Sequence, residues 1–190
     1  MAKSHIIETP RLRIIPFSEK HLTPCYIGWL NDPEVMCYSE QRHRSHTLES
    51  CRQYWQSFAD TPHYFWAVTV VDPNIGHIGN MNTYIDKSNS VADVGILIGD
   101  RSIWGRGYGL EAWVAVCNYL LHEVRIRKVT AGTQAINKGM LRLMERAGMV
   151  ADGRRIRQCM VDGMEVDIIH AALFKTNTCN PVIQQSIVRR

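Results

Sequence analysis

Apolar and polar residues alternate along this chain in short runs that predict seven β-strands, several of them rich in β-branched or aromatic residues. The predicted strands are residues 11–17, 63–71, 75–85, 93–98, 127–134, 154–161 and 164–174. Helical spacing and capping residues predict four helices, at residues 18–30 after the cap Ser18, at 48–59 after the cap Thr47, after Gly109, and at 137–146. The order β-α-α-β-β-β-α-β-α-β-β predicts an α/β fold with a mixed sheet.

Glycine and aspartate mark the boundaries between these elements. Asp162-Gly163, between the last two strands, is typical of a two-residue hairpin turn. Gly76 and Gly79 indicate a bulge or a close approach in the third strand. Gly148 suits the left-handed residue that closes the last helix.

Composition is that of an ordinary globular protein. A length of 190 residues suits one domain, here residues 1–175, followed by a tail at 176–190 without a clear pattern. No apolar run reaches the roughly 18 residues of a membrane span, and the first residues lack the apolar core of a signal peptide. The six cysteines include no C-x-x-C pair, which argues against a zinc site or a disulfide framework and favours a reducing cytoplasm.

The net charge of +4 is too small to imply nucleic-acid binding, but it is unevenly distributed. Residues 101–157 hold eleven Lys and Arg against four Asp and Glu. A basic second half suits a polyanionic ligand, and solvated helix faces would explain it equally well.

Gly105, Gly107 and Gly109 recur at every second position between a strand and a helical pattern. Glycines here let the backbone approach a ligand, and the free N–H groups of the first helical turn favour an anion, most often a phosphate. The alternative is a loop whose glycines only satisfy turn geometry. The dinucleotide fingerprint G-x-G-x-x-G fails at Leu110, and no Gly-Lys-Ser/Thr closes the turn as in a P-loop.

Residues 104–109 (WGRGYG), called the glycine turn below, resemble motif A of the GNAT acetyltransferases, Q/R-x-x-G-x-G/A. In that family the backbone amides of this motif hold the pyrophosphate of acetyl-CoA. Trp104 replaces the leading Gln or Arg and leaves one side-chain contact to the phosphate unassigned. The segments W-G-x-G-Y-G-x-E-A at 104–112, E-T-P-R-L-R at 8–13 and W-L-N-D-P-E-V at 29–35 resemble the RimJ/RimL branch of the superfamily. The resemblance covers about residues 8–174 and implies the GNAT acyl-CoA N-acyltransferase fold.

The resemblance implies acetyl-CoA as co-substrate and no metal. Its pantetheine arm is expected between the central strand and the strand after the long helix, against the backbone of the central strand. The residues thereby assigned to acetyl-CoA are Gly95, Ile96, Leu97, Ile98, Trp104, Gly105, Arg106, Gly107, Tyr108, Gly109 and Asn137. Asn137 opens the family's second motif, in which Met140 and Met144 stand where relatives carry Ser and Tyr. Thioethers cannot donate a proton to the leaving thiolate.

Asp93 is the first candidate for the base that removes the amine proton, because related enzymes often carry a glutamate at the start of this strand. An aspartate is shorter, so we expect a water molecule between it and the amine. The alternative is a strand-end carboxylate that caps a turn. His77 is a second candidate, since its reference pKa suits a base at neutral pH. Glu111, in the first turn of the long helix, is expected to be structural.

In the family, the first two helices and the loop between them bind the acceptor. That loop, residues 37–46, is polar and without periodicity, and the name acceptor loop is used for it below. The side chains that could contact substrate there are Tyr38, Arg42, His43, Arg44 and His46. Arg42, His43 and Arg44 would favour an anionic acceptor, and the alternative for each is a solvent-exposed side chain without a role.

The leading hypothesis is an acetyl-CoA-dependent N-acetyltransferase in which a primary amine attacks the thioester directly. The amine would be a protein N-terminus or a small molecule such as an amino sugar. The alternatives are a non-catalytic acyl-CoA-binding module and a nucleotide-binding protein built on the glycine turn. We expect a cytoplasmic protein without a nucleic-acid or membrane partner, and a homodimer, which is common in the RimJ/RimL branch, stays open.

Overall fold

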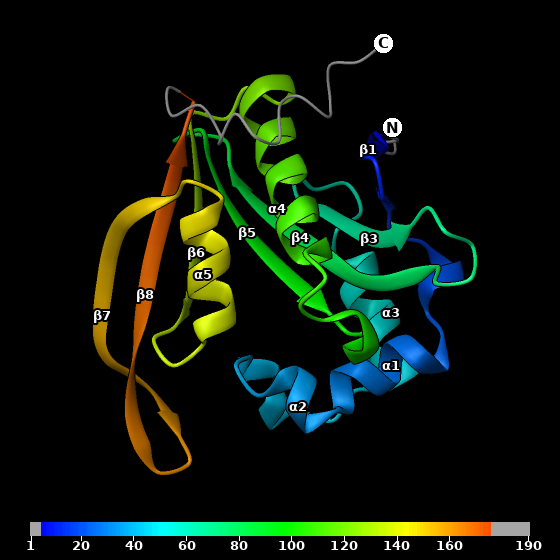
Figure 1. Cartoon of the computed structure of the whole chain (residues 1–190), viewed down its shortest axis with the longest axis horizontal. Helices are drawn as coiled ribbons and strands as arrows, with labels where there is room; N and C mark the ends of the chain where they lie inside the picture. Colours follow the sequence, from blue (N-terminus) through cyan, green and yellow to red (C-terminus); the bar gives the residue numbers. More distant parts are fainter. Residues whose placement is uncertain (1–4, 176–190) are drawn as a thin grey trace.

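The computed structural model describes residues 5–175, which form one eight-stranded mixed sheet (Figure 1). The strands are β1 (Ile7–Glu8), β2 (Leu12–Pro16), β3 (Tyr64–Val70), β4 (His77–Asp86), β5 (Val91–Ile98), β6 (Lys128–Gln134), β7 (Val150–Val161) and β8 (Met164–Phe174). Their order is β1-β2-β3-β4-β5-β6-β8-β7, and only the β5–β6 pair is parallel. The prediction of an α/β fold with a mixed sheet is confirmed. The tail expected at 176–190 lies outside the described residues.

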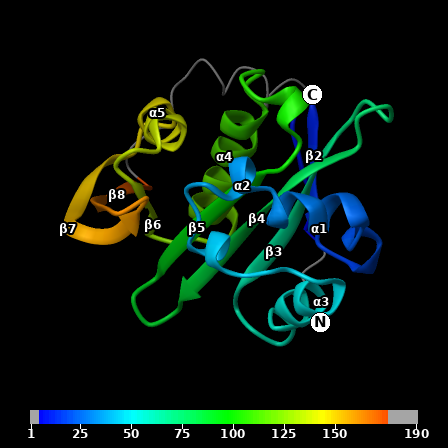
Figure 2. The same ribbon diagram turned by 90° about the horizontal axis from the view of Figure 1, so that it is seen from below.

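Helices cover both faces of the sheet (Figures 1 and 2). They are α1 (Pro24–Asn31), α2 (Pro33–Met36), α3 (Leu48–Gln56), α4 (Tyr108–Asn118) and α5 (Lys138–Arg146), with short helical turns η1 (Glu19–His21), η2 (Glu40–His43), η3 (Arg101–Ile103) and η4 (Tyr119–Glu123). α4 and α5 pack against one face, and α1 and α3 pack against the other. None of these helices is both long and apolar enough to cross a membrane.

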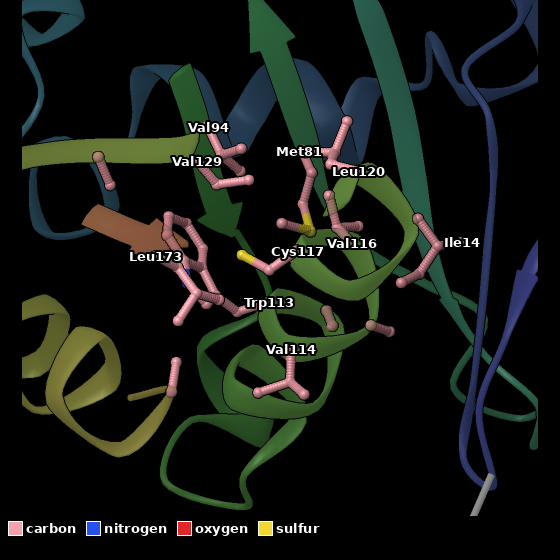
Figure 3. Close-up of a cluster of buried hydrophobic side chains, with 14 of the residues drawn as sticks. Ile14, Met81, Val94, Trp113, Val114, Val116, Cys117, Leu120, Val129 and Leu173 are labelled. Atoms are coloured by element: carbon pink, nitrogen blue, oxygen red, sulfur yellow. The ribbon is translucent and has the colours of Figure 1, made fainter. Parts of the chain in front are cut away.

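The larger core lies between α4 and the sheet (Figure 3). Trp113 and Cys117 of α4 are completely buried, and they belong to one cluster with Met81, Val94 and Leu173 from three strands. Each large side chain buried in this way stabilises the fold by about 1.5–3 kcal/mol. This packing fixes the first turn of α4, and with it the glycine turn, against the end of β5.

The sheet opens between its two parallel strands. β5 and β6 pair at only three positions, Val91 with Lys128, Ala92 with Val129, and Asp93 with Thr130. Beyond them β5 stays paired with β4 and β6 stays paired with β8. The edges of β5 and β6 that face each other there have no partner strand within residues 5–175, so a V-shaped gap with its vertex at Asp93 divides the sheet.

Several local predictions are confirmed. Asp162 and Gly163 both have positive φ, as a two-residue hairpin turn of mirror-image type requires. The β3–β4 register shifts next to Gly79, which is the predicted bulge. Gly148 has φ +79° and its N–H bonds to Glu145 O as it closes α5. Thr47 caps α3 through the N–H of Ser50.

The predicted helix from Ser18 to Leu30 is interrupted. Ser18 is a cap, and His21 Nδ1 accepts its backbone N–H, but it caps only the short turn η1, which has Leu22 as its C-cap. α1 begins at Pro24, which lacks an N–H and suits a first helical position, and Thr23 caps it. The acceptor loop also contains η2, and Asp32 caps the additional helix α2 just before it.

Candidate active site

A cleft of about 570 Å³ lies between the α1–α3 region and the face of β4 and β5, and it reaches the gap between β5 and β6. Its lining residues come from six parts of the chain: Tyr26, Leu30, Val35, Met36, Tyr38, Ser39, Gln41, Arg44, Ser45, His46, Ser50, Cys51, Tyr54, Asn80, Asn82, Tyr84, Val94, Gly95, Ile96, Leu97, Gly132, Thr133, Asn137 and Met140. Its volume is in the usual range for a small-molecule site.

Polar side chains of β4 form the floor of this cleft. Asn80, Asn82 and Tyr84 alternate along β4 and therefore share one face. Asn82 pairs with Gly95 of β5, and a Cβ at Gly95 would lie only 2.6 Å from Asn82 Oδ1. Gly95 thus provides the space in which the Asn82 carboxamide lies over β5.

Asp93 lies at the vertex of the gap, on the face of the sheet that carries this floor. It pairs with Tyr84 on one side and with Thr130 on the other, and Thr130 Oγ1 donates a hydrogen bond to Asp93 Oδ2 at 2.9 Å. Asp93 is exposed at the gap, but neighbouring protein partly desolvates its carboxylate and raises its pKa, which the hydrogen bond from Thr130 and the nearby His170 partly oppose. Asp93 does not itself line the cleft, and its neighbours Val94 and Gly95 do. One water molecule between Asp93 and the cleft is consistent with this placement.

His170 is a neighbour of Asp93 that sequence reasoning missed. It lies on β8 between Gly132 of β6 and Gly153 of β7, on the same face as Thr130. Its Nε2 is buried without a hydrogen-bond partner in the described part of the chain. The register of β8 against β6 brings His170 to this place, and no local sequence signal indicates it.

His77 is separated from this group. Its ring lies in a cluster of aromatic rings below α1, with centroids 5.2 Å from both His21 and Trp29. Its Nε2 is 2.8 Å from Gly79 O, and burial lowers the pKa of His77 to about 4. It does not line the cleft. The structure therefore brings Asp93 to the site and leaves the second candidate base in the packing of α1.

The glycine turn has the geometry of an anion cradle. Gly105 and Gly107 have φ of +77° and +83°, which other residues adopt only with strain, and Gly107 caps α4. In this turn and the first turn of α4, five backbone N–H groups have no hydrogen-bond acceptor among residues 5–175. They are those of Gly105, Gly107, Tyr108, Gly109 and Leu110. They lie at the positive end of the α4 dipole, where an anion is stabilised.

Trp104 and Arg106 take different positions in this turn. The indole N–H of Trp104 donates to Ile98 O at 2.9 Å, so it anchors the turn to the end of β5 and is not free for a phosphate. The side chain of Arg106 is exposed and makes no ion pair with a described residue. Arg106 is therefore the cation of the turn that remains open to a ligand.

Glu111 connects the start of α4 to the first strands, far away in the sequence. Its carboxylate accepts hydrogen bonds from Thr9 Oγ1 and from Arg11 Nε, both at 2.6 Å, and from Arg11 N at 3.1 Å. Arg11 also donates to Arg106 O at 3.0 Å and lies 4.5 Å from the centre of the Tyr108 ring. These contacts use the carboxylate fully and agree with a structural role for Glu111.

Asn137 stabilises the start of α5 and also lines the cleft. Its Oδ1 accepts the N–H of Met140 at 3.0 Å and caps α5, and its Nδ2 donates to Thr133 Oγ1 at 3.1 Å. Met140 lines the cleft, while Met144 is buried in the larger core. Neither methionine has a proton to donate.

The cationic residues of the acceptor loop have different surroundings. Arg42 bonds to Glu40 Oε1 at 2.9 Å and to Met160 O at 3.0 Å, so it ties the loop to β7. His43 lies 3.9 Å from Glu40 and lines a second cavity beside the β7–β8 hairpin. Arg44 lines the cleft, as Tyr38 and His46 do.

Comparison with known families agrees with this geometry. Residues 11–150 match the family model described as an acetyltransferase (GNAT) domain, so the chain belongs to the GNAT acetyltransferase family. Among individual proteins it is similar to the probable N-acetyltransferase YjcK of Bacillus subtilis (strain 168), at 26% identity over 110 residues. That match covers 57% of this chain and spans 59% of the length of YjcK.

Solved structures share the fold over most of the chain. A GNAT-family acetyltransferase from Bacillus anthracis has a TM-score of 0.76 at 21% identity and covers 90% of this chain and 99% of its own. Spermidine N-acetyltransferase from Vibrio cholerae, in complex with CoA and spermine, has a TM-score of 0.77 at 15% identity, with coverages of 87% and 96%. RimL, a ribosomal L7/L12 alpha-N-protein acetyltransferase in complex with CoA, has a TM-score of 0.77 at 15% identity. That match covers 90% of this chain and 98% of RimL. At these identities the likeness concerns the fold.

Proposed function

We propose that this protein is an acetyl-CoA-dependent N-acetyltransferase of the RimJ/RimL-like branch that acts on a primary amine. The observation that carries the proposal is the gap between β5 and β6, which joins two otherwise separate features. On the α4 side of the sheet the glycine turn offers free N–H groups, and on the other side lies the cleft. A donor that enters from the turn would reach the acceptor through the gap.

The residues present fit acetyl-CoA. The N–H groups of the glycine turn that have no acceptor among the described residues, together with the exposed Arg106, suit the pyrophosphate of acetyl-CoA. The β5 edge beyond Asp93 has no partner strand among the described residues, so its backbone groups can bond to the amides of the pantetheine arm. Gly109 lies between the end of β5 and α5. A Cβ at this position would lie 3.6 Å from Ile98 of β5 and 3.7 Å from Leu143 of α5.

The proposed reaction begins when the amine nitrogen attacks the thioester carbonyl of acetyl-CoA. The nitrogen loses its proton through water to the Asp93 carboxylate, for which the raised pKa is favourable. The C–S bond then breaks and the thiolate leaves. Met140 and Met144 cannot protonate it, but a thiol with a pKa of about 8.5 is a tolerable leaving group without help.

Calorimetric titration of the purified protein tests this function, with acetyl-CoA as ligand and ATP and NAD as controls. We expect micromolar binding of acetyl-CoA alone, and then transfer of the acetyl group to an amine in a panel. Binding without any turnover would favour the acyl-CoA-binding module. Binding of ATP or NAD in preference to acetyl-CoA would contradict the proposal.

A further inference from the structure

The described lining of the cleft carries positive charge and no negative charge. Among the residues of the described chain that line it, Arg44 is positively charged and none is Asp or Glu. The carboxylates nearby in sequence are already paired elsewhere: Asp32 and Glu34 with Arg101, and Glu40 with Arg42. The hydrogen bond from Arg42 lowers the pKa of Glu40, which keeps this carboxylate ionised and paired. Arg44 also lines the second cavity, as Asp32 and Asp162 do, but it forms no ion pair with a described residue. The cleft therefore offers a cation that is not paired with any described carboxylate.

Arg44 differs from Arg42 in what it is free to bind. The guanidinium of Arg42 is held by Glu40, Ser39 O and Met160 O. Arg44 is exposed on the cleft wall, and its guanidinium has no ion-pair or hydrogen-bond partner within residues 5–175. Five N–H donors on a planar, permanently charged group match a carboxylate or a phosphate.

The floor of the cleft is polar but uncharged, and it has unused hydrogen-bonding capacity. Asn80 is only 8% exposed, lines the cleft and has an Oδ1 atom without a partner in the described structure. A buried carboxamide oxygen without a donor is costly, and a ligand N–H or O–H would satisfy it. Further along the cleft, Tyr84 of β4 and Tyr54 of α3 have their hydroxyls 3.0 Å apart.

We propose that the acceptor is a small amine that also bears an anionic group, a carboxylate or a phosphate, and that Arg44 binds this group. The inference rests on the proposed function, since it names the acceptor class of the same site. Arg44 would hold the anion on the cleft wall while the amine lies over the Asn80–Asn82 floor, toward Asp93. A polyamine such as spermidine, with several positive charges and no carboxylate to meet in the cleft, would be a poor acceptor.

The charge of the reaction product tests this inference while the acceptor is still unidentified. The protein is incubated with radiolabelled acetyl-CoA and a cell extract. Labelled species that are absent both without extract and from extract without the protein are applied to an anion exchanger at neutral pH. Acetylation removes the positive charge of the amine, so an acceptor with an anionic group gives a retained product. Loss of retention after treatment with phosphodiesterase, pyrophosphatase and phosphatase together would identify a phosphate, and retention after that treatment a carboxylate.

The remaining outcomes separate the inference from the proposed function. Label in unretained small molecules or in proteins would overturn the anionic acceptor and leave the acetyltransferase in place. No labelled product at all would overturn both, even if acetyl-CoA binds in the calorimeter.

A charge-removing variant tests the role of Arg44 itself. For the retained acceptor, Arg44→Gln should raise KM about 10- to 100-fold with kcat within about threefold, the size expected for a lost charge-assisted hydrogen bond. Arg155→Gln on β7 is the matched control, because Arg155 is exposed, lies outside the cleft and should leave KM unchanged. Equal KM in wild type and Arg44→Gln, with acetyl-CoA binding intact in both, would overturn the assignment.

Discussion

The donor side and the acceptor side of the site are built in different ways. The glycine turn and the first residues of α4 form one contiguous stretch whose binding groups are backbone N–H groups, fixed in place by the buried Trp113 and by Glu111. The cleft takes its side chains from α1, α3, the acceptor loop, β4 and β5. A backbone site tolerates exchange of most side chains, whereas a side-chain site changes its ligand with each substitution. This difference suggests why family membership identifies the donor and not the acceptor.

The largest effect is expected from Gly107→Asp, which should affect the donor side alone. The substitution would add a negative charge at the cradle, with its Cβ 3.5 Å from Arg11 Nη2, and φ +83° strains any residue with a Cβ. Like-charge contact costs several kcal/mol, so acetyl-CoA affinity should fall on the order of 1,000-fold by calorimetry. Gly76→Asp is the control, since Gly76 has φ +71° in the β3–β4 turn and belongs neither to the glycine turn nor to the cleft lining. Unchanged affinity in Gly107→Asp would remove the phosphate assignment.

Asp93→Asn should lower the rate and leave the donor side intact. We expect kcat to fall about 100-fold, as for a lost general base, with acetyl-CoA binding kept. The carboxylate must be ionised to accept a proton, so the wild-type rate should fall as pH drops through the raised pKa of Asp93. The variant should lack this acidic limb and Asp93→Glu should retain it. A pH–rate profile decides, and an unaltered profile in Asp93→Asn would place the base elsewhere.

Glu111→Gln should act on stability rather than on chemistry. The substitution removes the charge that Arg11 and Thr9 contact, in a carboxylate that is mostly buried. The free energy of unfolding in denaturant should fall by about 1–3 kcal/mol. Glu8→Gln breaks the exposed pair with Arg13 and should cost less than about 1 kcal/mol. A loss of kcat without a loss of stability would instead give Glu111 a role in the reaction.

Met140→Ser should have the smallest effect, with kcat within about threefold of the wild type, because the proposed reaction uses no protein acid at this position. Met144→Ser is its counterpart in the core and should destabilise the fold by about 2 kcal/mol or more, with little effect on chemistry in the folded fraction. Single-turnover measurements at saturating acetyl-CoA make the comparison. A tenfold gain in Met140→Ser would show that protonation of the thiolate limits the natural enzyme.

Sequence reasoning succeeded where a few neighbouring residues determine the structure. The hairpin turn at Asp162, the cap Thr47 and the left-handed Gly148 follow from local chemistry, and all are present. It failed at the length of the first helix, because Thr23 precedes Pro24 and has an extended backbone, so η1 ends with its C-cap Leu22. Both signals are local, and the proline outweighed the capping residue Ser18.

The acceptor side was less predictable because its residues meet through strand register. His170 and Thr130 lie forty residues apart in the sequence and become neighbours of Asp93 through the β5–β6–β8 pairing. Asn80 looks like any polar residue in a half-buried strand until its unpartnered oxygen is seen. Arg42 and Arg44 are equivalent in the sequence, and the contacts of Arg42 with Glu40, Ser39 O and β7 distinguish them in the structure.

The three residue pairs that join β5 to β6 are few for a sheet of this size. With acetyl-CoA in the gap as proposed, its amide groups would add the hydrogen bonds that a strand would otherwise make, so the co-substrate would complete the sheet. A ligand that binds only the folded state raises the free energy of unfolding by about 2.7 kcal/mol at a concentration 100 times its Kd. The lifetime of this protein would then follow the supply of acetyl-CoA, with the chain most resistant to unfolding and proteolysis when its co-substrate is abundant.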